Sequence, residues 1–394
     1  MRAITVLSDR SGDVGGAERY WETVVPALAA RGITVRLLAR ELLPSARFGA
    51  AVTARAVPWA DEDGGTNLDA ARAVAAELRE HPPDVVVTAS VFDAAVLDAV
   101  RANALRWVAR IHDHRTFCPT GDRVYPQFEA PCSAAMGAAC RGASLVRGCV
   151  HGPRASSFRR IAERESLRDR IARADLVLVS SDHMRTTCIA NGVPAGRIEI
   201  TPPPLPDAAF AAIPAARPTA PTLLFASRLT PRKGLRSLIG ALAKLPAHER
   251  PALVVAGEGE AEERDARSQA AHDGVAVEWR GRLSAEELRD AIDASDAVAV
   301  PSLWPEPFGL VGIEAQARGR PAVAYEVGGI GDWISGAGIS VRRGDESALA
   351  SAIRAILDET TWSDFAGKAR AHAETYRLDA HVDRLLNVFQ GATR

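Results

Sequence analysis

Two glutamates in the second half of the chain lie in a setting suited to binding hydroxyl groups. Glu306 and Glu314 belong to the segment PSLWPEPFGLVGIEAQARGRPAVAYEVGGIGDWI, residues 301–334. Pro305 and Pro307 place Glu306 in a loop, and Gly309 lets the backbone approach a ligand before a helix that carries Glu314. The first turn of such a helix has unpaired N–H groups, which suit the oxygens of a sugar or a phosphate. Two glutamates eight positions apart would also fit a solvated helix. The interpretation as a binding site therefore depends on the two prolines and the glycine.

Two basic residues in the segment SRLTPRKGL, residues 227–235, are candidates for binding a diphosphate. The planar guanidinium of Arg228 can meet two phosphate oxygens, while Lys233 supplies a compact charge. A leaving diphosphate gains negative charge as its bond breaks, so preorganised cations would stabilise the transition state. Arg232 is predicted to be exposed. The alternative is that the cations only decorate a surface loop.

A glycine-rich turn follows the first predicted strand, in the segment GDVGGAERY, residues 12–20. Gly15 and Gly16 precede a helix predicted from about Ala17, so a phosphate or an acceptor could approach the helix N-terminus closely. The signal is weak by itself, because most sheets of this kind carry such a turn. No G-x-G-x-x-G pattern is present, which disfavours a dinucleotide cofactor.

Two histidines follow another predicted strand in the segment ARIHDHRTFCP, residues 109–119. Side chains alternate along a strand, so His112 and His114 are expected to share a face while Asp113 points away. Each histidine could instead be a hydrogen-bonded structural residue. His112 is the stronger candidate for the site.

The elements that must position these residues form two consecutive α/β series. Short apolar runs alternate with helix-length segments, which is typical of parallel sheets. The proline-dense segment at 201–210 is predicted to join the two series. The predicted strands are 3–8, 34–39, 84–88, 107–111, 176–180 and 198–201 in the first series, and 222–226, 252–256, 275–278, 297–301, 322–325 and 338–341 in the second.

The motifs resemble those of the retaining glycosyltransferases of family 4. That resemblance covers nearly the whole chain and implies a GT-B fold, in which two Rossmann-like doubly wound α/β domains face each other across a cleft. It further implies that Glu314 binds the ribose and that Glu306 and His112 serve as catalytic residues. The residues implied to bind the donor are Gly16, Arg228, Lys233, Phe308, Gly309, Leu310 and Glu314.

The predicted domains are residues 1–205 together with 376–394, and residues 206–375. The first would bind the acceptor and the second the nucleotide sugar. The last helix, from about 376, is assigned to the first domain because GT-B enzymes commonly return their final helix to it.

By this resemblance, the chain is expected to transfer a sugar from UDP or GDP to a hydroxyl acceptor with retention. Roles in glycan, glycolipid or secondary-metabolite biosynthesis would fit. No metal and no cofactor are expected to be required. The alternatives are a GT-B sugar phosphorylase or epimerase, and a non-catalytic protein that binds nucleotide sugars.

Composition places few further limits on function. The 394 residues exceed the usual size of one core, so two domains are expected. A formal net charge of −1 gives no sign of a nucleic-acid partner. The start of the chain resembles a first strand rather than a signal peptide, and no apolar run could span a bilayer, so a cytoplasmic location is expected.

An insertion at about 117–156 shows no clear periodicity. Four of the five cysteines lie in it: Cys118, Cys132, Cys140 and Cys149. A structural metal site, one or two disulfides and free thiols stay open as alternatives. Five arginines and no acidic residue lie between Arg141 and Arg160, which could attract a phosphorylated acceptor or a peripheral membrane contact, or could simply be a solvated face.

Overall fold

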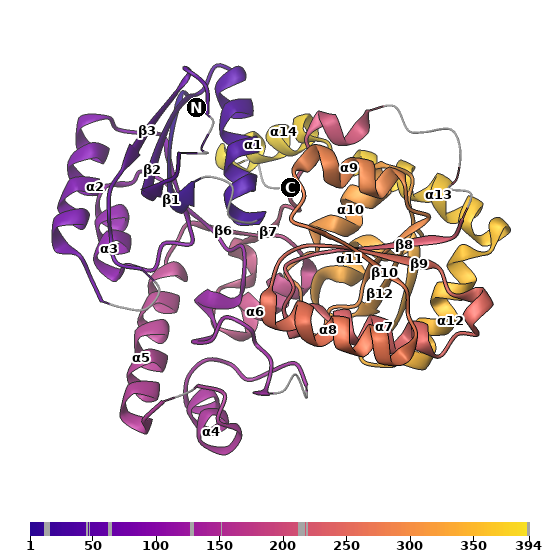
Figure 1. Ribbon diagram of the computed structural model, residues 1–394. Helices are drawn as coiled ribbons and strands as arrows, with labels where there is room; N and C mark the ends of the chain where they lie inside the picture. Colours follow the sequence, from indigo (N-terminus) through magenta and orange to yellow (C-terminus); the bar gives the residue numbers. More distant parts are fainter. Residues whose placement is uncertain are drawn as a thin grey trace. The chain divides into compact units, whose positions relative to one another are not determined.

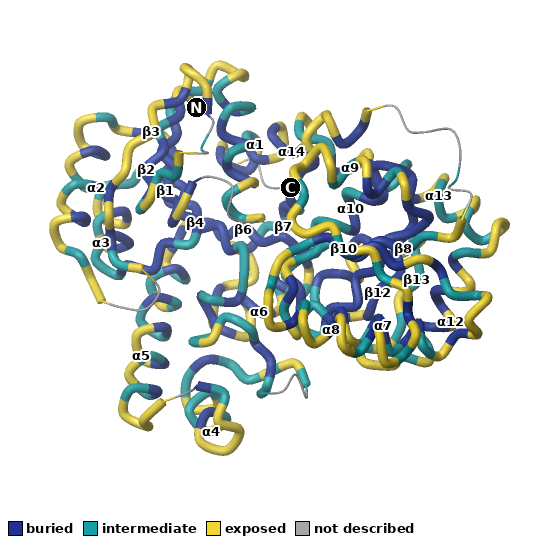
Figure 2. Tube along the Cα trace, viewed as in Figure 1, coloured by how far each residue is buried: buried dark blue, intermediate teal, exposed yellow. Residues whose placement is uncertain are grey.

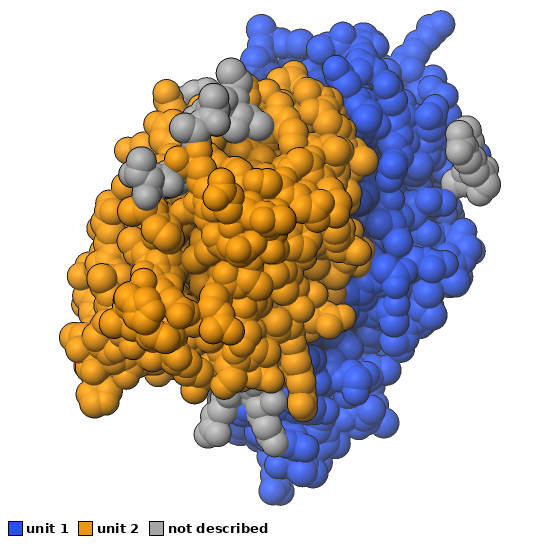
Figure 3. All heavy atoms as spheres, turned by 90° about the vertical axis from the view of Figure 1, so that its right-hand side faces the viewer, with its two compact units in different colours: residues 1–204, 378–394 blue, residues 205–377 orange. Residues whose placement is uncertain are grey.

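The computed structural model divides the chain into two compact units (Figure 3). Unit 1 comprises residues 1–204 and 378–394, and unit 2 comprises residues 205–377. The described residues are all those outside 12–15, 45, 47, 62–64, 127–129, 151, 212–216, 218–219 and 392–394. Each unit is built on a parallel sheet, which confirms the predicted α/β fold class.

Unit 1 contains a seven-stranded sheet in the order β3-β2-β1-β4-β5-β6-β7, with parallel neighbours (Figure 1). Its strands are β1 Ala3–Ser11, β2 Thr34–Leu42, β3 Val52–Ala56, β4 Val85–Ala89, β5 Trp107–Arg110, β6 Leu176–Val179 and β7 Ile198–Ile200. Its helices are α1 Gly16–Ala30, α2 Leu68–Glu80, α3 Ala94–Asn103, α4 Ala138–Arg147, α5 Arg154–Ile171, α6 Asp182–Ala190 and α14 Leu378–Phe389.

Both faces of this sheet are buried, because its central strands are apolar on both sides. Side chains alternate along β1, so Ile4 and Val6 pack into a core with α1 and α14, whereas Leu7 packs with α2, α3, α5 and α6. All five residues of β4 are buried. The central strands are accordingly dark in Figure 2.

Unit 2 contains a six-stranded parallel sheet in the order β10-β9-β8-β11-β12-β13. Its strands are β8 Thr222–Ala226, β9 Ala252–Ala256, β10 Val277–Gly281, β11 Ala297–Val300, β12 Ala322–Glu326 and β13 Gly338–Arg342. Its helices are α7 Leu235–Ala243, α8 Glu260–Asp273, α9 Ala285–Asp293, α10 Leu310–Ala317, α11 Gly331–Ile334, α12 Glu346–Leu357 and α13 Glu359–Ala373. One apolar core joins this sheet to its helices.

Two elements of unit 1 depart from the sequence prediction. Strand β3 was not predicted, because only Val52 of its five residues is buried and the strand lies at the sheet's edge. The sequence of the insertion shows no clear periodicity until about residue 156, so no helix was predicted there. Instead it contains the ten-residue helix α4, and α5 begins at Arg154. The small residues of α4 hide its periodicity.

None of the helices in the described part of the chain is long and apolar enough to cross a membrane.

Candidate functional site

In unit 2, the loops after neighbouring strands are joined by backbone hydrogen bonds. The loop after β8 pairs with the loop after β9, where the N–H of Leu229 donates to the carbonyl of Glu258 at 2.7 Å. It also pairs with the loop after β11, where the N–H of Leu303 donates to the carbonyl of Arg232 at 2.8 Å. Both predicted motifs of unit 2 are therefore held together at the carboxyl edge of one sheet, where open α/β sheets bind ligands.

Two glycines permit the close packing of these loops. Gly234 has φ of +76°, and a Cβ there would lie 1.9 Å from the carbonyl oxygen of Pro301. Gly328 has φ of +62°, and its Cβ would lie 2.3 Å from the carbonyl oxygen of Glu306. Any larger residue would meet backbone atoms in a conformation that L residues rarely adopt. These glycines therefore fix where Lys233 and Glu306 can lie.

Lys233 and Glu306 form a buried ion pair. The Lys233 Nζ donates to Glu306 Oε1 at 2.6 Å, and the two side chains are 15% and 7% exposed. Ser302 Oγ donates to the same oxygen at 2.6 Å. The ring of Trp304 lies 5.3 Å from the ammonium nitrogen, within range of a cation–π contact. The structure thus brings together two residues that were predicted to bind different parts of the donor, the diphosphate and the sugar.

The environment of Glu306 keeps its carboxyl ionised. Burial by itself raises the pKa, but the charge of Lys233 and hydrogen bonds from Lys233 and Ser302 outweigh it, so the pKa of Glu306 lies below its ordinary value. An ionised carboxylate only accepts hydrogen bonds, and it has about four lone-pair positions. Glu306 can therefore accept hydroxyl donors while keeping its pair with Lys233.

Helix α10 begins directly after Glu306's loop and carries Glu314, which is half-buried. Gly309, with φ of +96°, precedes the helix, and no side chain in the described part of unit 2 caps its first turn. The carbonyl of Phe308 accepts a hydrogen bond from Trp333 Nε1 at 2.6 Å. The N–H groups at the start of α10, at Leu310, face no capping side chain, which is the feature expected of a helix end that holds an oxygen ligand.

The two arginines of the loop after β8 have different environments. Arg228 is exposed, and the described residues give it no hydrogen-bond or ion-pair partner. Arg232 is not exposed as predicted: it is half-buried, with its guanidinium 4.8 Å from the centre of the Trp304 ring. The prediction failed because nothing in the local sequence shows that Trp304 comes to lie beside it.

In unit 1, Gly16 is the exposed first residue of α1. Gly15 and the rest of the glycine-rich turn at 12–15 lie outside the described residues. Glu18 lies in the first turn of this helix, and burial raises the pKa of its carboxyl although Arg115 partly opposes the shift.

His112 lies two residues beyond the end of β5, against aromatic rings of α1. Its ring centre is 5.2 Å from that of Tyr20 and 6.2 Å from that of Trp21. Its Nε2 is buried, with no hydrogen-bond partner among the described residues. Burial, with the nearby charges of Arg110 and Arg115, lowers the pKa of His112 well below 6.5. The ring is therefore neutral at pH 7.

His112 and His114 do not share a face, contrary to the alternation expected of a strand. Strand β5 ends at Arg110, and Asp113 caps a short turn by accepting from the N–H of Arg115 at 2.9 Å. His114 is therefore turned into the interior, where it is fully buried and its ring lies 5.4 Å from that of His183. This environment marks His114 as structural.

Behind His112 lies a buried network that the sequence did not reveal. The guanidinium of Arg110 lies 4.0 Å from the centre of the Tyr20 ring and donates to Thr201 Oγ1 at 2.6 Å and to its carbonyl at 3.0 Å. The Tyr20 hydroxyl lies 2.8 Å from His381 Nε2. His381 also forms a hydrogen bond with the backbone of Pro202, whose carbonyl must be the acceptor. Tyr20 and Arg110 were part of the quoted motifs, but their spacing gives no sign of this contact.

The cysteines of the insertion gather in space. The pKa of the Cys140 thiol is raised to about 11, mainly by burial. The nearby thiols of Cys118, Cys149 and Cys132 add to this shift. All five cysteines have free thiols, so the described residues contain no disulfide. Within the same residues, no group of three or more His, Cys, Asp or Glu side chains is arranged to hold a metal ion. Cys188 is fully buried in the core of unit 1.

Known protein families match both halves of the chain. Residues 208–375 match glycosyl transferases group 1, and residues 15–204 match the glycosyl transferase 4-like domain. A D-inositol 3-phosphate glycosyltransferase of Acidothermus cellulolyticus is 30% identical over 414 residues, which cover 97% of this chain and 86% of that protein.

Two further similarities are more limited, one in the length matched and the other in sequence identity. A glycogen synthase of Mycobacterium tuberculosis is 36% identical over 165 residues, so the match spans 41% of this chain and 39% of the synthase. The crystal structure of Anabaena Alr3699/HepE in complex with UDP has a TM-score of 0.74, covering 99% of this chain and 100% of that chain. At 19% sequence identity, this similarity concerns the fold alone.

Proposed function

We propose that this chain, which belongs to the group 1 glycosyl transferases, transfers a sugar from a UDP or GDP sugar to a hydroxyl acceptor with retention of configuration. Its fold agrees with the predicted GT-B class, since the sheet order of each unit is that of a doubly wound parallel domain. The observation that carries the proposal is the junction of the loops after β8 and β11, which pairs Lys233 with Glu306.

The loop after β8 supplies the proposed diphosphate site. Arg228 is exposed at the end of the strand, so its guanidinium can bind phosphate oxygens. The ammonium of Lys233 has three N–H donors and uses one for Glu306, so two remain for a phosphate. UDP is the ligand named for the Anabaena protein of similar fold, which supports a uridine or related nucleotide here.

The loop after β11 supplies the proposed sugar site. Glu306 is held as an ionised acceptor by Lys233 and Ser302, so its remaining lone pairs can bind sugar hydroxyls. The N–H groups at Gly309 and Leu310 begin α10 and can donate to the same ligand. Glu314 follows on α10, and we propose that it binds the ribose.

We propose that His112 acts beside the reacting carbon of the sugar. The carbon gains positive charge in the transition state of glycosyl transfer, so a protonated histidine next to it would be unfavourable. The lowered pKa of His112 keeps the ring neutral. The acceptor would then attack the face from which the diphosphate leaves, and a phosphate oxygen would take its proton. Positioning and electrostatic stabilisation would provide most of the rate.

The test is to incubate the protein with UDP and GDP sugars and a panel of alcohols, and to determine the product's anomeric configuration by NMR. A product with the donor's configuration is expected, and Glu306→Gln should lower kcat by at least about a hundredfold. An inverted product would contradict retention. Sugar phosphate formed from inorganic phosphate would indicate a phosphorylase, and an altered sugar formed without acceptor would indicate an epimerase.

A further inference from the structure

The segment 141–160, which we call the basic tip, combines positive charge with exposed apolar side chains. It contains five arginines and no aspartate or glutamate. Its arginines are Arg141, Arg147, Arg154, Arg159 and Arg160.

The two apolar side chains are adjacent at the end of α4. Leu145 is 52% exposed and Val146 is 82% exposed. The other large apolar residues that the described chain exposes are Leu68, Leu105 and Ile189, which are separate in sequence. Single exposed apolar residues are ordinary, whereas a neighbouring pair flanked by cations has the composition of a surface that enters the lipid interface.

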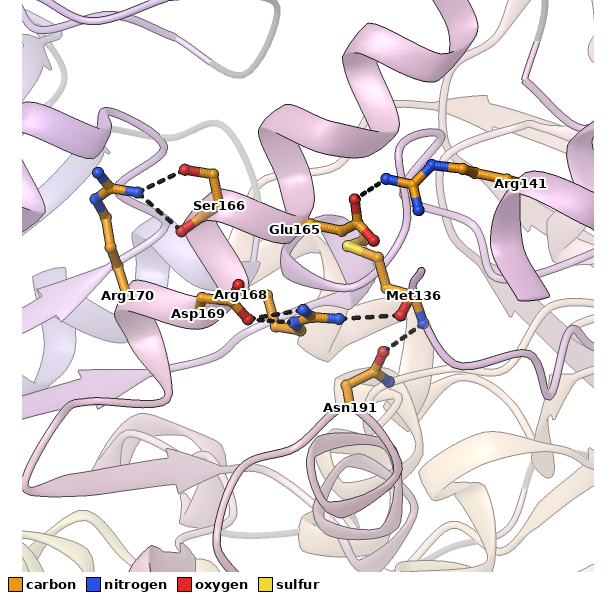
Figure 4. A network of polar contacts seen from close by, with 8 residues as sticks. All are labelled: Met136, Arg141, Glu165, Ser166, Arg168, Asp169, Arg170 and Asn191. Carbon is orange, nitrogen blue, oxygen red and sulfur yellow. Dashed lines mark hydrogen bonds and ion pairs between the residues drawn. The ribbon is translucent and has the colours of Figure 1, made fainter. Parts of the chain in front are cut away.

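An ion pair and hydrogen bonds attach the start of the basic tip to the rest of unit 1. Arg141 forms an ion pair with Glu165 of α5 (Figure 4). Arg168 of α5 donates to the carbonyl of Met136 at 3.0 Å, and the N–H of Met136 donates to Asn191 Oδ1 at 2.8 Å. Figure 2 shows the outer part of α4 as exposed. Helix α4 therefore presents its apolar pair from a fixed position.

Two arginines of the basic tip, Arg147 and Arg154, are exposed. Arg159 lies 3.7 Å from Glu163, and Arg141 is paired with Glu165. Arg154 is exposed and has no partner in the described residues. The guanidinium of Arg147 lies 4.9 Å from the centre of the Tyr125 ring. Arg147 and Arg154 therefore flank the apolar pair as exposed cations.

We propose that the basic tip docks on an anionic lipid surface. Leu145 and Val146 would enter the boundary between headgroups and acyl chains, and Arg147 and Arg154 would bind lipid phosphates. A free phosphorylated compound would gain nothing from the apolar pair, and it would require a pocket with buried donors. These arginines are exposed, so the composition favours a lipid surface.

The test is co-sedimentation of the purified protein with phosphatidylcholine vesicles that contain or lack phosphatidylglycerol, at low and high salt. Binding is expected only with phosphatidylglycerol, and it should weaken as salt rises. Arg147→Gln/Arg154→Gln should lower vesicle affinity at least about tenfold, since each arginine near such a surface contributes about fivefold. Leu145→Ser/Val146→Ser should lower it several-fold. None of these measurements depends on glycosyl transfer.

The matched control is Arg72→Gln/Arg79→Gln on α2, which removes the same charge from exposed positions elsewhere in unit 1. It should bind vesicles as the unaltered protein does, and all variants should keep its melting temperature. Equal losses in the control and in the basic-tip variants would overturn the proposal. So would the absence of binding to anionic vesicles, or full competition by inorganic phosphate.

Discussion

The contact between Lys233 and Glu306 has two consequences at the scale of single residues. An ion pair this deeply buried requires desolvation of both charges, and attraction with well-formed hydrogen bonds must offset that cost. The hydrogen bond from Ser302 supplies part of the offset. The pair therefore adds little net stability, but removal of one partner leaves the other as an uncompensated buried charge.

A double-mutant cycle tests this interpretation. Lys233→Ala or Glu306→Ala should each lower the free energy of unfolding by about 3 kcal/mol, because each leaves a buried charge. The double variant should lose clearly less than the sum, because no unpaired charge remains. Urea unfolding measures all three values, with Lys244→Ala as the control, since its contact with Glu346 is long and exposed. Additive losses would show that the two residues act independently.

Sequence could predict the residue types of this site but not their contacts. The prolines and glycine around Glu306 indicated a ligand-binding loop, and the structure does place Glu306 in a loop. The ion pair with Lys233 joins residues of two motifs that are far apart in the chain, so no local pattern contains it. For the same reason Arg232 was wrongly predicted to be exposed, although it packs on Trp304.

At the scale of elements, the turn at Gly234 connects the end of β8 to α7 and fixes Lys233. Gly336 offers a matched comparison, since both glycines have φ of +76°. A Cβ at Gly336 would meet nothing within 4 Å, whereas a Cβ at Gly234 would meet the carbonyl of Pro301. The two sites therefore separate backbone strain from steric conflict.

Gly234→Ala should lower the melting temperature clearly more than Gly336→Ala does. Both variants bear the strain of a positive φ, about 1 kcal/mol, but only Gly234→Ala must also move the loop after β11. Nucleotide binding should weaken in Gly234→Ala alone. Thermal unfolding and calorimetric titration measure both effects, and equal behaviour of the two variants would contradict the role given to Gly234.

Elements with buried apolar runs could be predicted, and elements without them could not. The runs at 222–226 and 252–256 form β8 and β9 with the predicted bounds. Strand β3 has one buried residue and α4 is rich in small residues, so neither produced a clear periodicity. The expectation that His112 and His114 share a face was wrong for a different reason, because the cap at Asp113 ends the strand alternation.

At the scale of the whole molecule, buried histidines make stability depend on pH. Burial lowers the pKa of His112 and His381 well below 6.5, and burial with Arg123 lowers that of His183 to about 4. In the unfolded chain these groups bind protons near pH 6.5, whereas in the folded protein they do not. The unfolded state therefore gains protons first, and stability falls as the pH drops below 6.5.

These histidines should thus leave the free energy of unfolding unchanged between about pH 7 and 8, and should lower it by up to about 1.4 kcal/mol per pH unit for each histidine between pH 6.5 and 4. His381→Gln, whose amide can accept from Tyr20 and donate to Pro202, should reduce that slope by one histidine's share. His248→Gln is the control, because its side chain is exposed. Urea unfolding at several pH values measures the slope, and an unchanged slope in His381→Gln would contradict this assignment.

Contacts between distant parts of the chain were the features that the sequence could not predict. The predicted division, 1–205 with 376–394 and 206–375, rests on the proline-dense segment and on the resemblance to GT-B enzymes, while the structure divides the chain at 204 and 377. The network of Tyr20, His381 and Pro202 joins α1, α14 and the end of the first segment, and its residues are separated by most of the chain. A binding cleft between the domains stays a prediction.

The most direct test of the proposed donor site is calorimetric titration of UDP, GDP and their sugars into the protein and into Arg228→Ala. Arg228 is exposed and unpaired in the described residues, so its removal should leave the fold intact. Arg264→Ala on α8 is the control, because it removes another exposed cation of unit 2 that belongs to neither proposed binding loop. We expect at least one nucleotide to bind, with affinity at least about tenfold weaker in Arg228→Ala and unchanged in Arg264→Ala. Failure of every nucleotide to bind, or equal affinity in both variants, would contradict the proposed diphosphate site.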